Sequence, residues 1–262
     1  MIHKTAIIDS KAKVSSMVEV GPYSVIGPDV EIDDDVIIQS HVTITGVTKI
    51  GKKNIFYPMS SIGSDPQDLK YKGEKTSLII GDGNTVREHV TINTGTIQGG
   101  GITKVGNNNL IMIGAHIAHD CIVGNNVVMA NDSAIAGHSV IEDFVIIGAK
   151  CGIQQFVRIG KLAMIGGMTG VSRDVIPYGV STGNRNFLNG INIIGLRRIK
   201  TENKDIITLT EAYKEIFKTE SLNNNLSKLK NKYKDNHLVD EVIQFINKDK
   251  KRPICTPYSE QQ

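Results

Sequence analysis

The sequence contains no tryptophan, and its 262 residues include only six phenylalanines and seven tyrosines. A core built around large aromatic rings is therefore not expected, whereas the 26 glycines suit a fold with many tight corners. No run of about eighteen apolar residues occurs, so no helix is expected to span a membrane. The first residues, MIHKTAIIDS, lack a basic segment followed by a long apolar run, so no signal peptide is expected.

Excess charge and paired cysteines are also missing. The chain has 30 basic and 27 acidic residues, and this near balance argues against nucleic acid as a partner. The three cysteines, Cys121, Cys151 and Cys255, are an odd number at spacings that fit neither a disulfide set nor a metal site. We therefore expect reduced thiols in a cytoplasmic protein, with no bound metal.

An aliphatic or aromatic residue recurs at every sixth position through most of the chain. The series runs from Ile2 to Ile62, resumes in the same phase from Ile80 to Ile92, and continues, shifted by one, from Val105 to Val171. An amphipathic helix would need apolar residues three, four and seven positions apart, so this period excludes one.

A six-residue period fits a short strand followed by a corner. Three such units close a triangular coil of eighteen residues, whose aliphatic side chains point inward and stack on those of the next coil. Adjacent coils pair in parallel at roughly 4.8 Å, so each residue lies over the one eighteen positions later. The repeat predicts an all-β parallel β-helix over residues 1–190.

Two stretches interrupt the repeat, at residues 63–79 and 93–104. They contain GSDPQDLKYKGEKTSL and NTGTIQGGGITK, which are polar and rich in turn-forming residues. We expect both to be extruded as loops, and loops held on a rigid scaffold often carry function. The second loop comes shortly before the segment Ile111–Val123, which contains two histidines.

The periodicity becomes helical towards the C-terminus, and residues 191–262 are expected to form a small helical domain. A middle helix with turns is expected around Asn223–Lys234, between two helices with clear apolar faces. These faces comprise Ile206, Leu209, Tyr213, Ile216 and Phe217 on one helix, and Val239, Val242, Ile243 and Ile246 on the other. Between Arg197 and Arg252, 14 basic and nine acidic residues leave a charge of +5. This surface is either an ordinary solvated helix face or a landing surface for an acidic protein.

The segment IMIGAHIAHDCIV places polar side chains on the coil that no core contact would explain. Adding eighteen to Asp120 gives His138, so these two side chains should lie roughly 5 Å apart on adjacent coils. The same step from His119 gives Gly137 and then Gln155. The histidines could be surface residues without a role or metal ligands, but the column also has the composition of a small active site.

The column suits acyl transfer. A neutral imidazole can remove a proton from an alcohol near pH 7, which is typically worth ~10²–10⁴ in rate. A nearby carboxylate would orient the ring, and the backbone N–H of Gly137 could stabilise an oxyanion, a contact worth ~3–4 kcal/mol. Because no serine or cysteine nucleophile is evident, we expect direct transfer to a bound hydroxyl.

Four segments carry a resemblance to a known family: NLIMIGAHIAHDCIVGNN, AIAGHSVIEDFVIIG, IQQFVRIG and SIGSDPQDLKYKGE. The repeat resembles that of the hexapeptide-repeat acyltransferases, which implies a left-handed β-helix, against the usual right-handed crossover. Over nearly its full length, the chain resembles the UDP-N-acetylglucosamine O-acyltransferases.

The resemblance implies a homotrimer with active sites between subunits. It also implies transfer of an (R)-3-hydroxyacyl chain from acyl carrier protein to the sugar 3-hydroxyl, the first step of lipid A biosynthesis. No cofactor is implied, because the chain arrives on the phosphopantetheine of the carrier.

Position by position, the resemblance implies roles for individual residues. His119 matches the general base, Asp120 its neighbour in the site, and Gly137 the oxyanion donor. The residues implied to bind substrate or line the site are Gln67, Asp68, Lys70, His116, His138, Gln155, Asn192 and Arg198. Of these, the last two are implied to hold the diphosphate end of the nucleotide, where a guanidinium suits phosphate. Gly166 and Gly167 fall in the region implied to gauge acyl length, where glycine leaves room for a longer chain.

Three positions depart from the family pattern. Gln154, Ile194 and Ile199 stand where a histidine, an acid and a second arginine are common. These departures leave the base and the oxyanion donor intact. We therefore expect any difference from the family to affect binding of the nucleotide end or the choice of acceptor sugar.

Two other functions fit parts of the sequence. A zinc enzyme of the γ-carbonic-anhydrase type shares the β-helix and trimer, and its ligands would be His116, His119 and His138. That family spaces its close histidine pair more widely, and it does not explain the loop around Asp68 and Lys70. Another hexapeptide acyltransferase, using coenzyme A or a 3-amino sugar nucleotide, is the second alternative. Small-acyl enzymes of that kind seldom need a basic helical tail.

Overall fold

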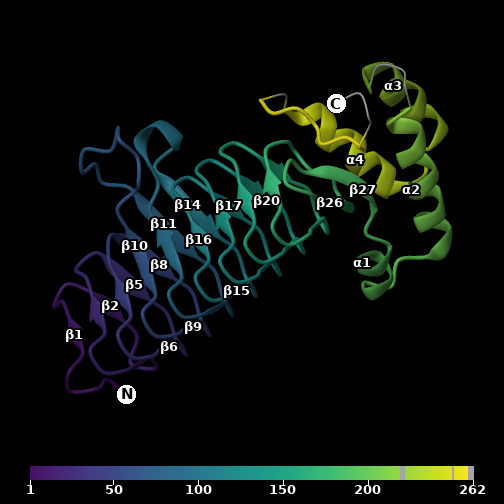
Figure 1. The fold of residues 1–262 in the computed structure, drawn as a ribbon. Coiled ribbons are helices and arrows are strands. Elements are labelled where there is room, and N and C mark those ends of the chain that lie inside the picture. Colours follow the sequence, from purple (N-terminus) through teal and green to yellow (C-terminus); the bar gives the residue numbers. More distant parts are fainter. Residues whose placement is uncertain (219–221, 250, 259–262) are drawn as a thin grey trace.

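The computed structural model describes residues 1–218, 222–249 and 251–258. It confirms the left-handed parallel β-helix, a triangular coil with one sheet on each of its three sides (Figure 1). The coil runs from the N-terminus at the lower left of the figure to a group of helices at the right.

Each sheet consists of very short strands that come from successive coils. Within the described residues, the first sheet contains, in spatial order, β1 (Ile7–Ile8), β4 (Val25–Ile26), β7 (Thr43–Ile44), β10 (Ser61–Ser64), β13 (Thr91–Asn93), β16 (His116–Ile117), β19 (Ala134–Ile135), β22 (Gly152–Ile153) and β25 (Gly170–Val171). The second contains β2 (Lys13–Val14), β5 (Val30–Ile32), β8 (Val47–Ile50), β11 (Ser77–Ile80), β14 (Ile102–Val105), β17 (Ile122–Val123), β20 (Val140–Ile141) and β23 (Arg158–Ile159). The third contains β3 (Glu19–Val20), β6 (Ile37–Ile38), β9 (Ile55–Phe56), β12 (Thr85–Val86), β15 (Leu110–Ile111), β18 (Val128–Met129), β21 (Ile146–Ile147), β24 (Met164–Ile165), β26 (Gly179–Thr182) and β27 (Phe187–Ile191).

Outside the two loops, strand pairing follows the eighteen-residue spacing as far as β25, whereas β24 and β26 pair sixteen residues apart and β27 runs antiparallel to β26. Ile117 pairs in parallel with Ile135, and Ile135 pairs with Ile153. Across the first loop, between β10 and β11, corresponding residues are 30 apart, as in the hydrogen bond from Asn84 to Asn54. Across the second loop, between β13 and β14, they are 25 apart. The loops therefore add residues without changing which side chains point inward.

The repeat positions form the core of the coil. Ile44, Ile62, Ile117 and Ile135 are all completely buried, as expected for inward side chains stacked between coils. Ile2, at the open N-terminal end, is 55% exposed because no further coil covers it. The core is thus a continuous column of aliphatic side chains, and function must be carried by outward-facing residues and loops.

Corners of the coil commonly hold a non-glycine residue in the left-handed backbone region. Asp120, His138 and Phe156 have φ angles of 60°, 62° and 66° at successive levels of one corner. The same conformation occurs at corners far from these, including Tyr23 and Lys53. It therefore belongs to the coil geometry and does not by itself single out a functional site.

The helices at the C-terminal end are α1 (Ile193–Arg198), α2 (Asn203–Ile216), α3 (Leu222–Lys232) and α4 (His237–Lys248). The two apolar faces predicted for α2 and α4 are largely buried: Ile206, Leu209, Ile216, Val239, Val242, Ile243 and Ile246. The sequence patterns did not predict α1, which is too short to show a helical period. Among the described residues, no helix has the length and apolar character needed to cross a bilayer.

Arg158, at the start of β23, joins the helices to the coil. Its Nε donates to Oδ2 of Asp174 at 2.7 Å, and its backbone N–H donates to Oδ1 at 2.8 Å. The same guanidinium donates to the carbonyl oxygens of Phe245 and Asp249, both at 3.0 Å. One buried arginine thus anchors the C-terminal end of α4 to the top of the coil.

Candidate active site

The column predicted from the eighteen-residue spacing forms at one corner of the coil, just after β16, β19 and β22. The backbone N–H of His138 donates to the carbonyl of His119, and that of Phe156 donates to the carbonyl of Gly137, both at 3.1 Å. The ring of His138 meets the ring of His119 edge-on, with centroids 5.0 Å apart. Three coils therefore contribute adjacent side chains to one site.

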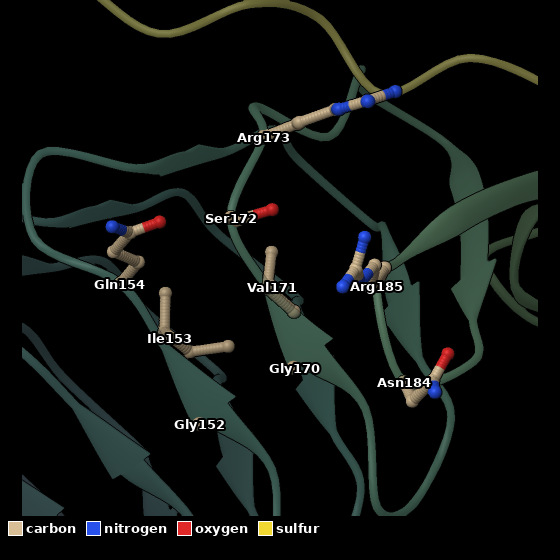
Figure 2. Close-up of a pocket in the computed structure, with 9 residues that line it drawn as sticks. All are labelled: Gly152, Ile153, Gln154, Gly170, Val171, Ser172, Arg173, Asn184 and Arg185. Carbon is tan, nitrogen blue, oxygen red and sulfur yellow. The ribbon is translucent and has the colours of Figure 1, made fainter. Parts of the chain in front are cut away.

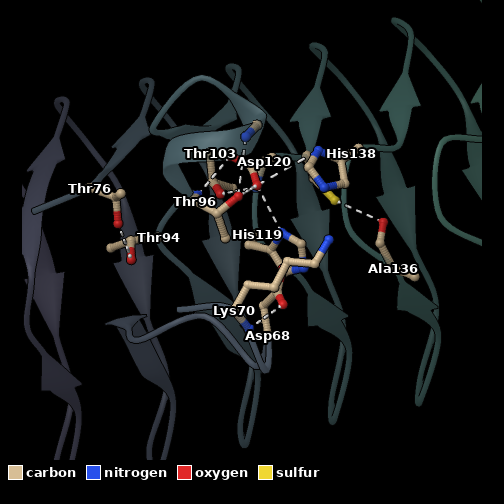
Figure 3. A network of polar contacts seen from close by, with 12 residues as sticks. Asp68, Lys70, Thr76, Thr94, Thr96, Thr103, His119, Asp120, Ala136 and His138 are labelled. Atoms are coloured by element: carbon tan, nitrogen blue, oxygen red, sulfur yellow. Dashed lines mark hydrogen bonds and ion pairs between the residues drawn. The ribbon is translucent and has the colours of Figure 1, made fainter. Parts of the chain in front are cut away.

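His119 and Asp120 form a buried, hydrogen-bonded pair (Figure 3). Nδ1 of His119 lies 2.8 Å from Oδ2 of Asp120. Because a carboxylate can only accept, Nδ1 carries the proton and Nε2 keeps its lone pair. The two residues are only 3% and 6% exposed, although the repeat alone suggested side chains projecting into solvent. The second loop folds back over them and accounts for the difference.

Gly137 lies directly against the imidazole of His119. A Cβ at this position would be 2.4 Å from Cε1 and 2.7 Å from Nε2 of His119, which is well inside van der Waals contact. Within the described residues, the backbone N–H of Gly137 donates no hydrogen bond. A free backbone donor thus lies close to the nitrogen that can act as a base.

The carboxylate of Asp120 receives further donors from the second loop. The backbone N–H of Thr96 donates to Oδ1 at 2.8 Å, and its hydroxyl donates to Oδ2 at 2.6 Å. The backbone N–H of Asp120 donates to Oγ1 of Thr103 at 2.8 Å. Both the side chain and the backbone of Asp120 are therefore held by this loop and the strand that follows it.

A pocket of about 420 Å³ opens beside this pair. Asp68 and Lys70 of the first loop line it together with Asp120 and His138. Figure 3 shows Asp68 and Lys70 reaching from their loop towards the histidines. Gln67 lies exposed on the same loop. The pocket is also lined by residues of the second loop and of the C-terminal segment, namely Gln98, Gly99, Asp249 and Lys251.

Two histidines of the site are biased towards the neutral form. Burial lowers the pKa of His116, and neighbouring His119 adds to the effect. Burial also lowers the pKa of His138, although the charge of Asp120 opposes the shift. Nδ1 of His116 is paired with the hydroxyl of Thr91 at 2.7 Å. Both rings are therefore suited to hydrogen bonding with uncharged polar groups rather than to ion pairing.

The other residues proposed from the sequence lie on the C-terminal half of the coil and on α1. Gln155 is exposed one level above Gly137, and its carbonyl accepts from Arg252 at 3.0 Å. The amide of Asn192 caps α1 through Gly195 and donates to the carbonyl of Leu162 at 2.9 Å. Arg198 is exposed at the end of α1.

The two glycines proposed for acyl-length control lie one coil level further along. Gly166 and Gly167 follow β24, beyond the lining of the pocket beside His119. In this chain, neither they nor Asn192 and Arg198 line that pocket.

A second pocket, of about 620 Å³, lies along β22 and β25 (Figure 2). Gln154 lines it at one side, and the guanidinium of Arg185 points into it. None of the residues proposed from the sequence to bind or react lines this pocket. Its described lining contains no acidic side chain: Gly152, Ile153, Gln154, Gly170, Val171, Ser172, Arg173, Asn184 and Arg185.

The geometry does not favour the zinc alternative. Among the described residues, the ligand atoms of His119, Asp120 and His138 lie within 4.8 Å of one another, but His116 is outside this group. The carboxylate of Asp120 already accepts hydrogen bonds from Thr96 and His119, so its lone pairs point at protons. Within the described part of one chain, the three histidines that a zinc enzyme would require are therefore not assembled.

Two residues of the site were not recognised from the sequence. Phe156 stacks on His138 with ring centroids 4.5 Å apart and planes 4° apart. It is eighteen positions after His138, so the repeat spacing could have identified it. Thr96 could not be found in this way, because it lies in an extruded loop that has no register with the coil.

Comparison with known proteins places the chain among well-described relatives. Residues 2–46 and 102–137 match the bacterial transferase hexapeptide model, and residues 174–255 match domain 2 of UDP N-acetylglucosamine O-acyltransferase. The chain is 44% identical to the acyl-[acyl-carrier-protein]–UDP-N-acetylglucosamine O-acyltransferase of Rhizobium rhizogenes, over 98% of this chain and 95% of the relative. A crystal structure of a UDP-N-acetylglucosamine acyltransferase is 40% identical, with a TM-score of 0.95, over 99% of this chain and 100% of that one. The Francisella novicida enzyme is 35% identical, with a TM-score of 0.96, over 100% of this chain and 96% of that one.

Proposed function

The chain belongs to the family of UDP-N-acetylglucosamine O-acyltransferases, and from this premise we propose the reaction that it catalyses. It transfers an (R)-3-hydroxyacyl chain from acyl carrier protein to the 3-hydroxyl of UDP-N-acetylglucosamine, the first step of lipid A biosynthesis. Relatives that share 39% to 44% of their residues with nearly the whole chain bear the name of this activity. The cytoplasmic location expected from the sequence stays a prediction.

We infer that His119 is the general base. Its Nε2 removes the proton of the sugar 3-hydroxyl as the oxygen attacks the carbonyl carbon of the acyl thioester. The backbone N–H of Gly137 donates to the oxyanion that forms. Collapse of this intermediate breaks the carbon–sulfur bond, and the imidazolium returns the proton to the departing thiolate. The observation that carries this mechanism is the hydrogen bond from Nδ1 of His119 to Asp120, because it leaves Nε2 basic beside a free N–H donor.

The first loop supplies groups for the sugar nucleotide. Asp68 and Lys70 line the pocket beside His119, where a carboxylate and an ammonium can bind sugar hydroxyls and the diphosphate. Gln67 would join them from the same loop. His116, His138 and Gln155 complete the set around the sugar.

We propose that the active assembly is a homotrimer in which neighbouring subunits share each site. Asn192 and Arg198 lie outside the pocket that holds Asp120 in the same chain. They can serve the nucleotide only if they reach the site of an adjacent subunit. In such an assembly, Gly166 and Gly167 would border the acyl chain.

An acyl-transfer assay tests the proposal. Purified protein would receive UDP-N-acetylglucosamine and a panel of 3-hydroxyacyl carrier proteins, beside the 3-amino sugar nucleotide as a second acceptor. We expect ester product from the first acceptor. Product from the 3-amino acceptor alone would move the function to the amide-forming alternative, and no product with stoichiometric zinc would favour the zinc enzyme of the γ-carbonic-anhydrase type.

The His119→Ala variant tests the role of the base. We expect the rate to fall by ~10²–10⁴ while assembly and melting temperature stay as in the wild type. His89→Ala, which removes an exposed histidine from another corner, is the matched control. If His119→Ala lost assembly or thermal stability instead, His119 would be structural and the mechanism would have to be abandoned.

A further inference from the structure

The second loop holds Asp120 with two donors from a single residue. Thr96 is only 1% exposed, and its backbone N–H and hydroxyl bind the two carboxylate oxygens at 2.8 and 2.6 Å (Figure 3). Oγ1 of Thr96 also accepts the N–H of Gly99 at 3.2 Å. Since that lone pair is occupied by Gly99, the hydroxyl proton is directed at Asp120.

The rest of the loop is shaped to fit the same carboxylate. A Cβ on Gly99 would lie 2.0 Å from Cγ of Asp120, so the loop can pass this close only with glycine there. A one-turn 3₁₀ helix, Ile97–Gly99, is capped by the Thr96 side chain and sets the approach. The contact between loop and carboxylate is therefore built from several mutually dependent features.

The carboxylate of Asp120 lies close to two histidines. Its Oδ2 is 2.8 Å from Nδ1 of His119 but also 3.7 Å from Nδ1 of His138. A modest rotation of the carboxylate would transfer the strong hydrogen bond from the first ring to the second. The two Thr96 donors oppose this rotation, because they fix both carboxylate oxygens at once.

We propose that Thr96 is a positioning residue for the acyl transfer, an inference that rests on the function proposed above. It keeps Asp120 turned towards His119, and Asp120 in turn keeps the proton on Nδ1 and the lone pair on Nε2. Thr96 does not touch the substrate in this arrangement. Its effect reaches the reaction only through the aspartate and the histidine.

The test uses three threonine variants of the full-length protein. Thr96→Val keeps the shape of the side chain but removes the hydroxyl donor, so we expect kcat to fall ~10–10²-fold with little change in either KM. Thr96→Ser keeps the donor and should restore most of the rate. Thr94→Val makes the same change two residues away in the same loop, where the hydroxyl pairs with Thr76 instead, and should keep the wild-type rate.

A double variant separates positioning from loop packing. In the His119→Ala background, Thr96→Val should cause no further loss, because the residue through which it acts is already gone. If Thr96→Val lowered the melting temperature, Thr96→Ala would replace it in the same set of comparisons.

Four outcomes would overturn the inference. They are a wild-type kcat in Thr96→Val, an equal loss in Thr94→Val, a lack of rescue by serine, and a further loss in the double variant. A failure of the proposed function looks different, because the wild-type protein itself would then form no ester product. If His119→Ala is inactive and Thr96→Val is fully active, only the role of Thr96 is wrong.

Discussion

At the scale of single residues, the site is defined by which atoms of His119 are already engaged. Asp120 binds Nδ1 from one side, and Gly137 leaves the opposite nitrogen uncovered. The proposed base and the proposed oxyanion donor thus face one gap between two adjacent coils. Any side chain at position 137 would fill that gap, so the identity of this residue can be tested directly.

Gly137→Ala should abolish most activity without unfolding the coil. The added methyl group would overlap with Cε1 and Nε2 of His119, at 2.4 and 2.7 Å, and must displace the ring. A displacement of this size is expected to cost ~10²-fold in kcat. Gly152→Ala is the control, since a methyl group there meets no atom within 4 Å. Steady-state rates and thermal melts of both variants decide the point, and an active Gly137→Ala enzyme would remove Gly137 from the mechanism.

The cysteines should be inert in the native protein. Burial raises the pKa of Cys121 to about 12 and that of Cys255 to about 11, and it also raises the pKa of Cys151. Because only the thiolate attacks disulfide reagents, native protein at neutral pH should react far more slowly with Ellman's reagent than denatured protein. All three thiols should react in guanidinium chloride. A fast-reacting thiol in the native state would contradict the burial of that residue.

The spacing of the repeat predicted the contact between Asp120 and His138 and could also have identified Phe156, but it could not identify Thr96. Asp120 and His138 differ by eighteen positions, and the pairing of their coils brings them together as expected. Thr96 reaches Asp120 across 24 residues from an extruded loop. No periodic spacing relates them, because the path of the loop depends on its own turns and on the close approach at Gly99.

At the scale of elements, the buried Arg158–Asp174 pair forms one polar link between the coil and α4, beside the contacts of Lys161 and Tyr178 with Glu241. Burial raises the pKa of Asp174, while the hydrogen bonds and charge of Arg158 act in the opposite direction. The carboxylate therefore depends on this arginine to remain charged in a buried place. Position 158 follows the repeat as a strand residue, but no pattern in the sequence predicts that an arginine there would be buried.

Arg158→Met should destabilise the protein by about 3–5 kcal/mol, because it leaves Asp174 buried without its partner. The folded-state pKa of Asp174 should rise further, so its carboxyl is neutral at low pH in the folded variant. When the pKa of a carboxyl is higher in the folded than in the unfolded state, folding is favoured below the pKa of the unfolded state. That contribution to the free energy of unfolding is lost as the pH rises through the folded pKa. The difference in free energy of unfolding between the wild type and Arg158→Met should therefore shrink towards acidic pH.

Chemical denaturation at several pH values measures this effect. Arg87→Met is the control, because Arg87 pairs with Glu88 at the partly exposed surface and should contribute far less. If the loss of unfolding free energy in Arg158→Met stayed constant across acidic pH, Asp174 would not be the buried charge that the substitution leaves without a partner.

The helices illustrate the limits of periodicity as a predictor. α2 and α4 extend over three or more turns, so their apolar stripes were visible in the sequence. α1 has six residues and is defined by its cap, in which Asn192 accepts the N–H of Gly195. A cap of this kind becomes recognisable only when the residues that hold the loop in place are known.

At the scale of the whole molecule, the proposed homotrimer would bring together site residues that lie apart in one chain. His119, Asp120 and the first loop meet at one pocket, whereas Arg198 is exposed on a helix outside it. Closed rotational symmetry would give each site the same two contributing surfaces. Whether the basic segment between Arg197 and Arg252 is an ordinary solvated helix face or a landing surface for an acidic carrier protein stays an open prediction.

Mixing two defective variants tests whether subunits share sites. Arg198→Ala should mainly raise KM for the sugar nucleotide, so this variant is nearly inactive at a limiting concentration of that substrate. His119→Ala should be nearly inactive at any concentration. When equal amounts are unfolded and refolded together, about a quarter of the sites should draw an intact His119 from one subunit and an intact Arg198 from its neighbour. The refolded mixture should then regain about a quarter of the wild-type rate. The same proteins mixed without refolding should stay at the sum of their separate low activities. If co-refolding restored nothing, although the variants formed mixed assemblies, both residues would belong to one subunit's site, and the proposed arrangement between subunits would be wrong.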